Sequence, residues 1–99
     1  MTIRFVWDPE KAATNWRDHK VRFEVATRVF ADPFAWTAQD RIENGEMRWQ
    51  TLGVVEGSFH VLLVAHTVSE DEDGTEVIRI ISARRADQKE RKRYEQSNR

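Results

Sequence analysis

The hydrophobic pattern at the start of the chain predicts a strand followed at once by a helix. Apolar and polar residues alternate over Thr2–Trp7, as in a strand with one buried face. The pattern stops at Asp8-Pro9, where aspartate can cap a helix and proline suits its first position. A helix is therefore expected from about Pro9 to Asp18. Its inward stripe is expected to consist of Ala12, Ala13 and Trp16.

A second short helix follows, and after it a segment whose secondary structure the pattern does not decide. Apolar residues at helical spacing predict a helix over Phe23–Phe30. Asp32-Pro33 ends it, because the residue before a proline disfavours the α region. The segment Phe34–Arg41 fits either a strand or a loop. Asn44-Gly45 is typical of a tight turn.

Three strands and a final helix complete the pattern. The strands are expected over Met47–Val55, Phe59–Thr67 and Glu76–Arg84. Glu56-Gly57-Ser58 suits a hairpin turn, the acidic segment Ser69–Thr75 suits a solvated loop, and Asp87–Gln96 reads as a helix. This order predicts an α+β fold: an antiparallel sheet of about four strands with two N-terminal helices and a C-terminal helix. Residues 1–99 are expected to form a single domain.

Composition narrows the functional classes. The chain is 39% hydrophobic and 33% charged, and it has no cysteine, which excludes disulfides and thiolate chemistry. No apolar run approaches the roughly 20 residues of a membrane span, and the N-terminus lacks a signal-peptide pattern. A cytoplasmic location without a membrane partner is therefore expected.

The net charge of −1 hides an uneven distribution. Residues 69–78 carry five acidic side chains and no basic one, whereas residues 79–99 carry eight basic side chains against three acidic ones. The excess of basic groups in the second segment favours contact with phosphates or with an acidic partner. A solvated amphipathic helix is the alternative explanation.

The stretch Val77–Ala86 places arginines within and at the end of an apolar strand. Alternation predicts two faces, Val77, Arg79, Ile81 and Ala83 on one and Ile78, Ile80, Ser82 and Arg84 on the other. A guanidinium in such a strand is costly to bury unless an acid or a bound anion meets it, and its planar fork fits phosphate. The sequence leaves open whether Arg79 pairs with an acid such as Glu46, and whether it converges with Arg48.

Several basic and aromatic side chains together suit RNA cleavage without a metal. The 2′-hydroxyl can attack the adjacent phosphorus if cations stabilise the phosphorane and another group moves protons. A guanidinium can do the first, a histidine the second, and an aromatic ring can stack on a base. The candidates are Lys11, His19, Arg48, His60, His66, Arg79, Arg84 and Arg85, with Trp7 and Trp49.

Other chemistries have little support in the sequence. The histidines at positions 19, 60 and 66 lack the local spacing of a zinc site, so neither a metal nor another cofactor is expected. No glycine-rich phosphate loop and no nucleophile elbow is present. Structural roles also stay open, since Trp7 can belong to the core and His19 can cap its helix. His60 and His66 fit ordinary strand positions.

Two sequence blocks and their spacing carry a family resemblance. The first is Phe5-Val-Trp-Asp-Pro-Glu-Lys-Ala12 with Asn15 and His19, and the second is Arg79-Ile-Ile-Ser-Ala-Arg-Arg-Ala86 with Glu90-Arg91 and Tyr94. Between them lie Val21-Arg-Phe-Glu-Val-Ala26, Val29-Phe30-Ala-Asp-Pro33, Arg48 with Gly53, and Val61-Leu-Leu-Val-Ala-His-Thr67. From about Ile3 to Glu95 the chain resembles the BrnT family, the toxin half of bacterial type II toxin–antitoxin pairs.

The resemblance implies a compact α+β fold like that of the RelE toxins and a ribonuclease activity that blocks translation. It also implies a partner, a small DNA-binding antitoxin of the BrnA type, whose complex with the toxin represses its own operon. Contact with operator DNA is thus expected only through the antitoxin. The alternative is a non-catalytic module, such as an inactive toxin copy, that binds the antitoxin or nucleic acid.

The resemblance also implies roles for individual residues. Arg79 and Arg48 are expected to hold the scissile phosphate and to offset its charge in the transition state. His19 or Lys11 is the expected proton-transfer group. The residues expected to contact RNA are Trp7, Arg84 and Arg85.

The chain departs from the family pattern at two positions near the end of the first helix. His19-Lys20 replaces the usual His-Gly, and a glycine there would allow a left-handed helix terminus. Arg22 replaces a serine that would cap the second helix, so this cap is expected to be lost. Both changes concern local geometry rather than the arginines.

Overall fold

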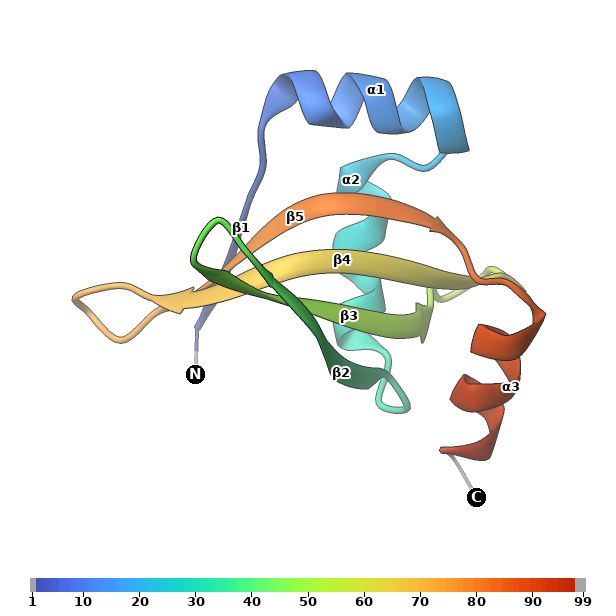
Figure 1. Cartoon of the computed structure of the whole chain (residues 1–99). Helices are drawn as coiled ribbons and strands as arrows, with labels where there is room; N and C mark the ends of the chain where they lie inside the picture. Colours follow the sequence, from blue (N-terminus) through green and yellow to red (C-terminus); the bar gives the residue numbers. More distant parts are fainter. Residues whose placement is uncertain (1, 98–99) are drawn as a thin grey trace.

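The computed structural model describes residues 2–97 and contains a mixed five-stranded sheet (Figure 1). The strands lie in the order β1-β5-β4-β3-β2 and span Ile3–Val6 (β1), Trp36–Glu43 (β2), Glu46–Val54 (β3), Val61–Glu70 (β4) and Glu76–Arg85 (β5). The helices are α1 (Pro9–His19), α2 (Phe23–Ala26), the 3-10 helix η1 (Thr27–Ala31) that continues it, and α3 (Gln88–Gln96). The predicted α+β class is confirmed.

The sheet differs in detail from the antiparallel one of about four strands that the sequence predicts. β1 adds a fifth strand and pairs in parallel with β5, from Ile3 beside Glu76 to Val6 beside Arg79. The open question over the segment after Pro33 is answered by the strand β2. The expectation of a purely antiparallel sheet was wrong because local patterns predict strands but not which distant segments pair.

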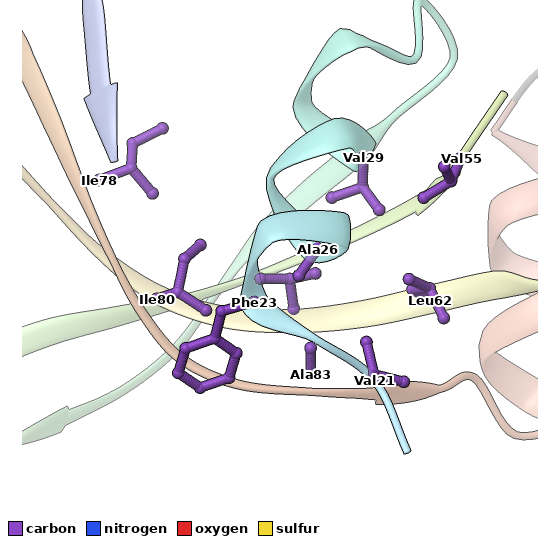
Figure 2. Close-up of a cluster of buried hydrophobic side chains, with 10 residues drawn as sticks. Val21, Phe23, Ala26, Val29, Val55, Leu62, Ile78, Ile80 and Ala83 are labelled. Atoms are coloured by element: carbon purple, nitrogen blue, oxygen red, sulfur yellow. The ribbon is translucent and has the colours of Figure 1, made fainter. Parts of the chain in front are cut away.

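α2 and η1 pack on one face of the sheet and form the main core with it (Figure 2). Phe23, Ala26 and Val29 are fully buried there, together with Ile80 of β5. Gly53 on β3 lets η1 approach closely, since a Cβ at this position would lie 3.0 Å from both the Cβ and the carbonyl oxygen of Val29. We call this side the helix-covered face.

α1 packs against the outer edge of β5 beyond Arg79, where β1 no longer pairs with this strand. The Asn15 side chain fills this gap: its Nδ2 donates to the carbonyl oxygens of Ala83 (2.9 Å) and Val21 (2.8 Å). Its Oδ1 accepts from the Ala83 N–H at 2.9 Å. Buried backbone groups need hydrogen-bond partners, so an amide side chain here replaces a neighbouring strand.

The inward stripe predicted for α1 was therefore wrong in part. Asn15 is buried, whereas Ala12 is only partly buried and Ala13 and Trp16 are exposed. The physical reason is that α1 meets the edge of the sheet, where free backbone groups decide which helix position turns inward. The predicted helix start is confirmed, since the Asp8 side chain accepts from the N–H of the second helical residue at 2.9 Å.

The end of α1 has a left-handed residue although the chain carries a lysine where a glycine is usual. Lys20 adopts the left-handed conformation itself, with φ of 57°, and its N–H donates to the Trp16 carbonyl at 3.0 Å. A side chain in this conformation costs roughly 1–2 kcal/mol relative to the right-handed one. The predicted loss of a cap on α2 is confirmed, because the Arg22 side chain makes no capping hydrogen bond.

On the opposite face of the sheet, α3 covers one end. A smaller apolar cluster that includes Leu52 and Leu63 packs there against Tyr94 of α3. The Tyr94 hydroxyl donates to Oδ2 of Asp32 at 2.5 Å, which ties α3 to the segment before β2. The rest of this side we call the arginine face; its polar side chains include Arg48, Gln50, Thr67, Arg79, Ser82 and Arg84.

An irregularity in β5 decides which side chains reach the arginine face. The β4–β5 register shifts between Ala65 and His66, which leaves Ile81 unpaired. Beyond this bulge the alternation moves by one residue, so Arg84 lies on the same face as Arg79. The predicted separation of these two arginines, and of Ser82 from Arg79, was wrong because a bulge leaves no mark in an alternating sequence pattern.

Candidate functional site

Arg48 and Arg79 lie in one row across the arginine face, with Thr67 of β4 between them. Thr67 pairs with Arg79 in the β4–β5 register. Trp49 pairs with His66 in the β3–β4 register, so the residue before it, Arg48, comes opposite Thr67. Neighbouring strands are roughly 4.8 Å apart, which puts the backbones of the two arginines about 10 Å apart. The two side chains therefore converge on one face.

The β2–β3 hairpin brings two acids to these arginines. Its Asn44-Gly45 turn has positive φ at both residues, 52° and 80°, as a strongly twisted hairpin requires. Figure 1 shows the turn end of the hairpin crossing in front of β4 toward β5. Glu46 Oε1 lies 2.7 Å from Arg79 Nη2, and Glu43 Oε2 lies 3.1 Å from Arg48 Nη1.

These ion pairs answer one question that the sequence left open and add one residue that it did not reveal. The pairing of Arg79 with Glu46 is confirmed. Glu43 was not singled out, although its place beside an Asn-Gly turn is a signal that could have found it. Both pairs are partly exposed, with side-chain exposures of 43% for Arg79 and 48% for Glu46, so solvent weakens them.

The Arg48 guanidinium is the more deeply placed of the two. Its side chain is 16% exposed, and its Nε is buried without a hydrogen-bond partner in the part of the chain that the structure describes. Leaving a buried donor without an acceptor costs roughly 1–3 kcal/mol. The site thus holds an unused donor that an anionic oxygen atom would satisfy.

Arg84 is held by α3 rather than by the hairpin. Its Nη1 and Nη2 lie 2.9 and 3.0 Å from the two carboxylate oxygens of Glu90, a bidentate arrangement. The bond to Glu90 raises the pKa of Arg84; burial opposes ionisation of Glu90, but bonds from Arg84 and the Asp87 N–H lower its pKa overall. Glu90 and Asp87 also form the capping box of α3. Arg84 therefore fixes the start of α3 on the sheet.

Lys11 and His19 line a hollow of about 400 Å³ between α1 and β5. Both side chains are exposed, and Ser82 forms part of the opposite wall. Because Ser82 belongs to the arginine face, the hollow lies at the edge of that face. Its wall also carries acidic groups, namely Asp8, Glu10 and Asp18. The structure thus brings Lys11 and His19 together but lines their hollow with neither Arg48 nor Arg79.

Two of the predicted RNA-contacting residues lie on the helix-covered side. Trp7 is partly buried and packs edge-on against Phe23, with ring centroids 6.0 Å apart. Arg85 is exposed and pairs in register with Leu62, so it faces away from Arg84. The predicted residues are therefore divided between two sides of the sheet.

The remaining histidines have different surroundings. His66 is buried, its Nε2 lies 2.8 Å from the Thr51 hydroxyl, and its ring stands edge-on to Phe30. Burial lowers the pKa of His66, which favours the neutral form and confirms an ordinary strand role. His60 is exposed and precedes β4, so the predicted strand over Phe59–Thr67 begins two residues later than expected.

A family model described as "Ribonuclease toxin, BrnT, of type II toxin-antitoxin system" matches residues 7–90, which is most of the chain. No curated protein matches. Within residues 2–97, no group of three or more histidine, aspartate or glutamate side chains is placed to hold a metal ion. No helix in the same range has the length and apolar content that crossing a membrane requires.

Proposed function

The chain belongs to the BrnT family of ribonuclease toxins of type II toxin–antitoxin systems, and from this premise we propose that it is a metal-independent endoribonuclease that inhibits translation. It acts in the cytoplasm on RNA, and an antitoxin of the BrnA type neutralises it. Operator DNA is contacted only through the antitoxin. The observation that carries the proposal is the row formed by Arg48, Thr67 and Arg79 on the sheet face opposite the main core.

Arg79 and Arg48 are the phosphate-binding groups in this proposal. Each already has a carboxylate beside it, and a carboxylate presents two anionic oxygens as a phosphate does. Exposed ion pairs such as Arg79–Glu46 contribute only about 0–1 kcal/mol, so an RNA phosphate can displace Glu46 at little cost. Arg48 is less exposed, so displacing Glu43 costs more. The unpaired Nε of Arg48 would gain an acceptor in the exchange.

The reaction itself needs only groups of this chain and of RNA. The 2′-oxygen attacks the adjacent phosphorus as its proton leaves, the 5′-oxygen departs and takes up a proton, and a cyclic phosphate results. Arg79 and Arg48 stabilise the charge that builds on the phosphorane oxygens. His19 or Lys11, at the edge of the arginine face, moves a proton.

The other expected RNA contacts take more limited roles. Arg84, held by Glu90, supports the face by fixing α3 and presents its remaining edge to RNA. Trp7 packs against Phe23, so its role is to hold the end of β1 against the core rather than to stack on a base. The exposed Arg85 contacts RNA on the other side of the sheet, as developed below.

A second candidate, a non-catalytic module that binds the antitoxin or nucleic acid, is favoured by one observation. Arg48, Arg79 and Arg84 are each paired with an acid of the same chain. Two experiments separate the candidates. The toxin cleaves single-stranded RNA in EDTA and arrests growth when expressed without its antitoxin. The module does neither, yet binds the antitoxin tightly.

A further inference from the structure

A second basic surface lies on the helix-covered side, at the C-terminal end of α1. A hollow of about 300 Å³ is lined there by the cations Lys20, Arg22 and Arg85, by His60 and by Trp16. We call this group the Trp16 patch. Its floor is apolar and includes Leu62. Residues from α1, from the α1–α2 connection, from the approach to β4 and from the end of β5 thus line one hollow.

Two cations of the Trp16 patch lie against the indole ring. The Arg22 guanidinium lies 4.2 Å and the Lys20 ammonium 5.3 Å from the ring centroid of Trp16. Trp16 is nevertheless 40% exposed, so part of its ring is available. Cations held by an aromatic face are fixed in place without being neutralised.

The charge of the Trp16 patch is unbalanced, in contrast to that of the arginine face. No acidic side chain lines the hollow, and within residues 2–97 none of Lys20, Arg22 and Arg85 forms an ion pair. Phe59, which is fully exposed, lies in the chain between two residues of the hollow's rim. Clustered cations beside exposed aromatic rings are the arrangement by which proteins bind single-stranded nucleic acid.

The patch also lies next to the proposed catalytic edge. His19 lines the hollow beside the arginine face, and the next residue, Lys20, lines the Trp16 patch. The two hollows therefore flank the same end of α1. A strand of RNA can pass from one to the other around this helix end.

We propose that the Trp16 patch is a subsite for a nucleotide of the RNA outside the cleaved bond. Its base stacks on the exposed part of Trp16, and its phosphates meet Arg22, Lys20 and Arg85. This inference rests on the proposed ribonuclease function and adds a substrate-positioning surface to it. The size of the hollow favours a nucleotide over a protein helix, because 300 Å³ is at the lower limit of small-ligand sites.

The test measures binding of a non-cleavable probe, a fully 2′-O-methylated single-stranded 12-mer, by fluorescence anisotropy. Trp16→Leu is expected to weaken binding about tenfold through lost stacking. Each phosphate contact contributes roughly 0.7 to the slope of log Kd against log salt for a single strand. The double variant Arg22→Gln/Arg85→Gln removes two such contacts and is expected to reduce this slope by about 1.4. The matched control Arg28→Gln/Lys92→Gln removes two exposed cations elsewhere and is expected to keep the slope.

The outcomes separate the subsite from the function. If the Trp16 and Arg22/Arg85 variants bind the 12-mer like the folded wild type, the subsite is refuted, while cleavage by the wild type would still support the toxin activity. If these variants lose affinity for the antitoxin but not for the 12-mer, the patch belongs to an acidic protein partner and the RNA assignment is overturned. Failure of the wild type to cleave any RNA refutes the proposed function itself. Thermal unfolding of each variant verifies that it is folded.

Discussion

Glu46 and Arg79 are joined by a 2.7 Å ion pair although they lie on β3 and β5, with β4 between them. The contact exists because the twisted β2–β3 hairpin carries its turn back over the sheet (Figure 1). The hairpin therefore decides whether the two central arginines face solvent, an internal acid or a ligand. In the structure both arginines pair with glutamates of the hairpin. The central question is therefore whether an RNA phosphate replaces these carboxylates.

Removal of the Arg79 guanidinium should abolish most RNA cleavage. Arg79→Ala takes away a cation that offsets charge in the transition state, for which a loss of about 10²- to 10³-fold in kcat is expected. Cleavage of single-stranded RNA is measured in EDTA. The folded control Lys92→Ala, at an exposed position of α3, should retain activity. Full activity in Arg79→Ala would refute the role assigned to this residue.

Neutralising the competing acid should strengthen RNA binding. Glu46→Gln removes the carboxylate that occupies Arg79, and affinity for a non-cleavable RNA should rise about two- to fivefold, the range of an exposed ion pair. Stability should change by less than about 0.5 kcal/mol. Glu24→Gln, which neutralises an exposed acid of α2, controls for the general change in charge. Equal affinities of Glu46→Gln and Glu24→Gln would show that Glu46 does not compete with phosphate.

A glycine at the end of α1 should stabilise the fold. Lys20 holds a left-handed conformation that glycine adopts freely, and Lys20→Gly should gain about 0.5–1 kcal/mol after the added entropy of the unfolded chain is subtracted. The midpoint of thermal unfolding should rise by several degrees. Ala13→Gly, at an exposed helical position of α1, should instead lose about 1 kcal/mol. A loss in both variants would contradict the conformational explanation.

The hydroxyl of Tyr94 should titrate late and report on the docking of α3. Burial, together with the bond to the Asp32 carboxylate, raises the pKa of Tyr94 to about 12. The chain has one tyrosine, so its ultraviolet titration reads this group alone. Asp32→Asn should move the midpoint back toward the ordinary value of about 10.

The sign of the linked stability follows from the raised pKa. Tyr94 contributes stability that is fully present below about pH 10 and is lost as pH rises toward 12. Urea unfolding of the wild type should therefore weaken over this interval more than that of Tyr94→Phe. A parallel decline in the two proteins would show that the tyrosine is not linked to folding.

The parts of the fold that could be predicted are those with local causes. Asp8-Pro9 predicts the start of α1, and Asn44-Gly45 predicts the turn that the structure shows. Side chains of β3 and β4 alternate between the two faces as the two-residue period of a strand requires. These features depend on capping, turn conformation and the two-residue period of a strand, all of which act between near neighbours in sequence.

The parts that could not be predicted depend on contacts between distant segments. The bulge at Ile81 moves every later side chain of β5 to the other face of the sheet. The sequence gives no sign of it, because Ile80 and Ile81 are both apolar. Asn15 looks like a surface residue until its partner Ala83 is known. The curl of the hairpin, which brings Glu43 to Arg48, is likewise a property of the assembled sheet.

The parallel pairing of β1 with β5 has a consequence for how the protein is made. Ile3 cannot find Glu76 until the ribosome has synthesised everything between them, and such long-range pairing is slow to form. The same late strand supplies Arg79 and Arg84. A nascent chain therefore has no complete row of Arg48, Thr67 and Arg79 before β5 has emerged, so the ribosome that makes it meets the completed surface only after that point.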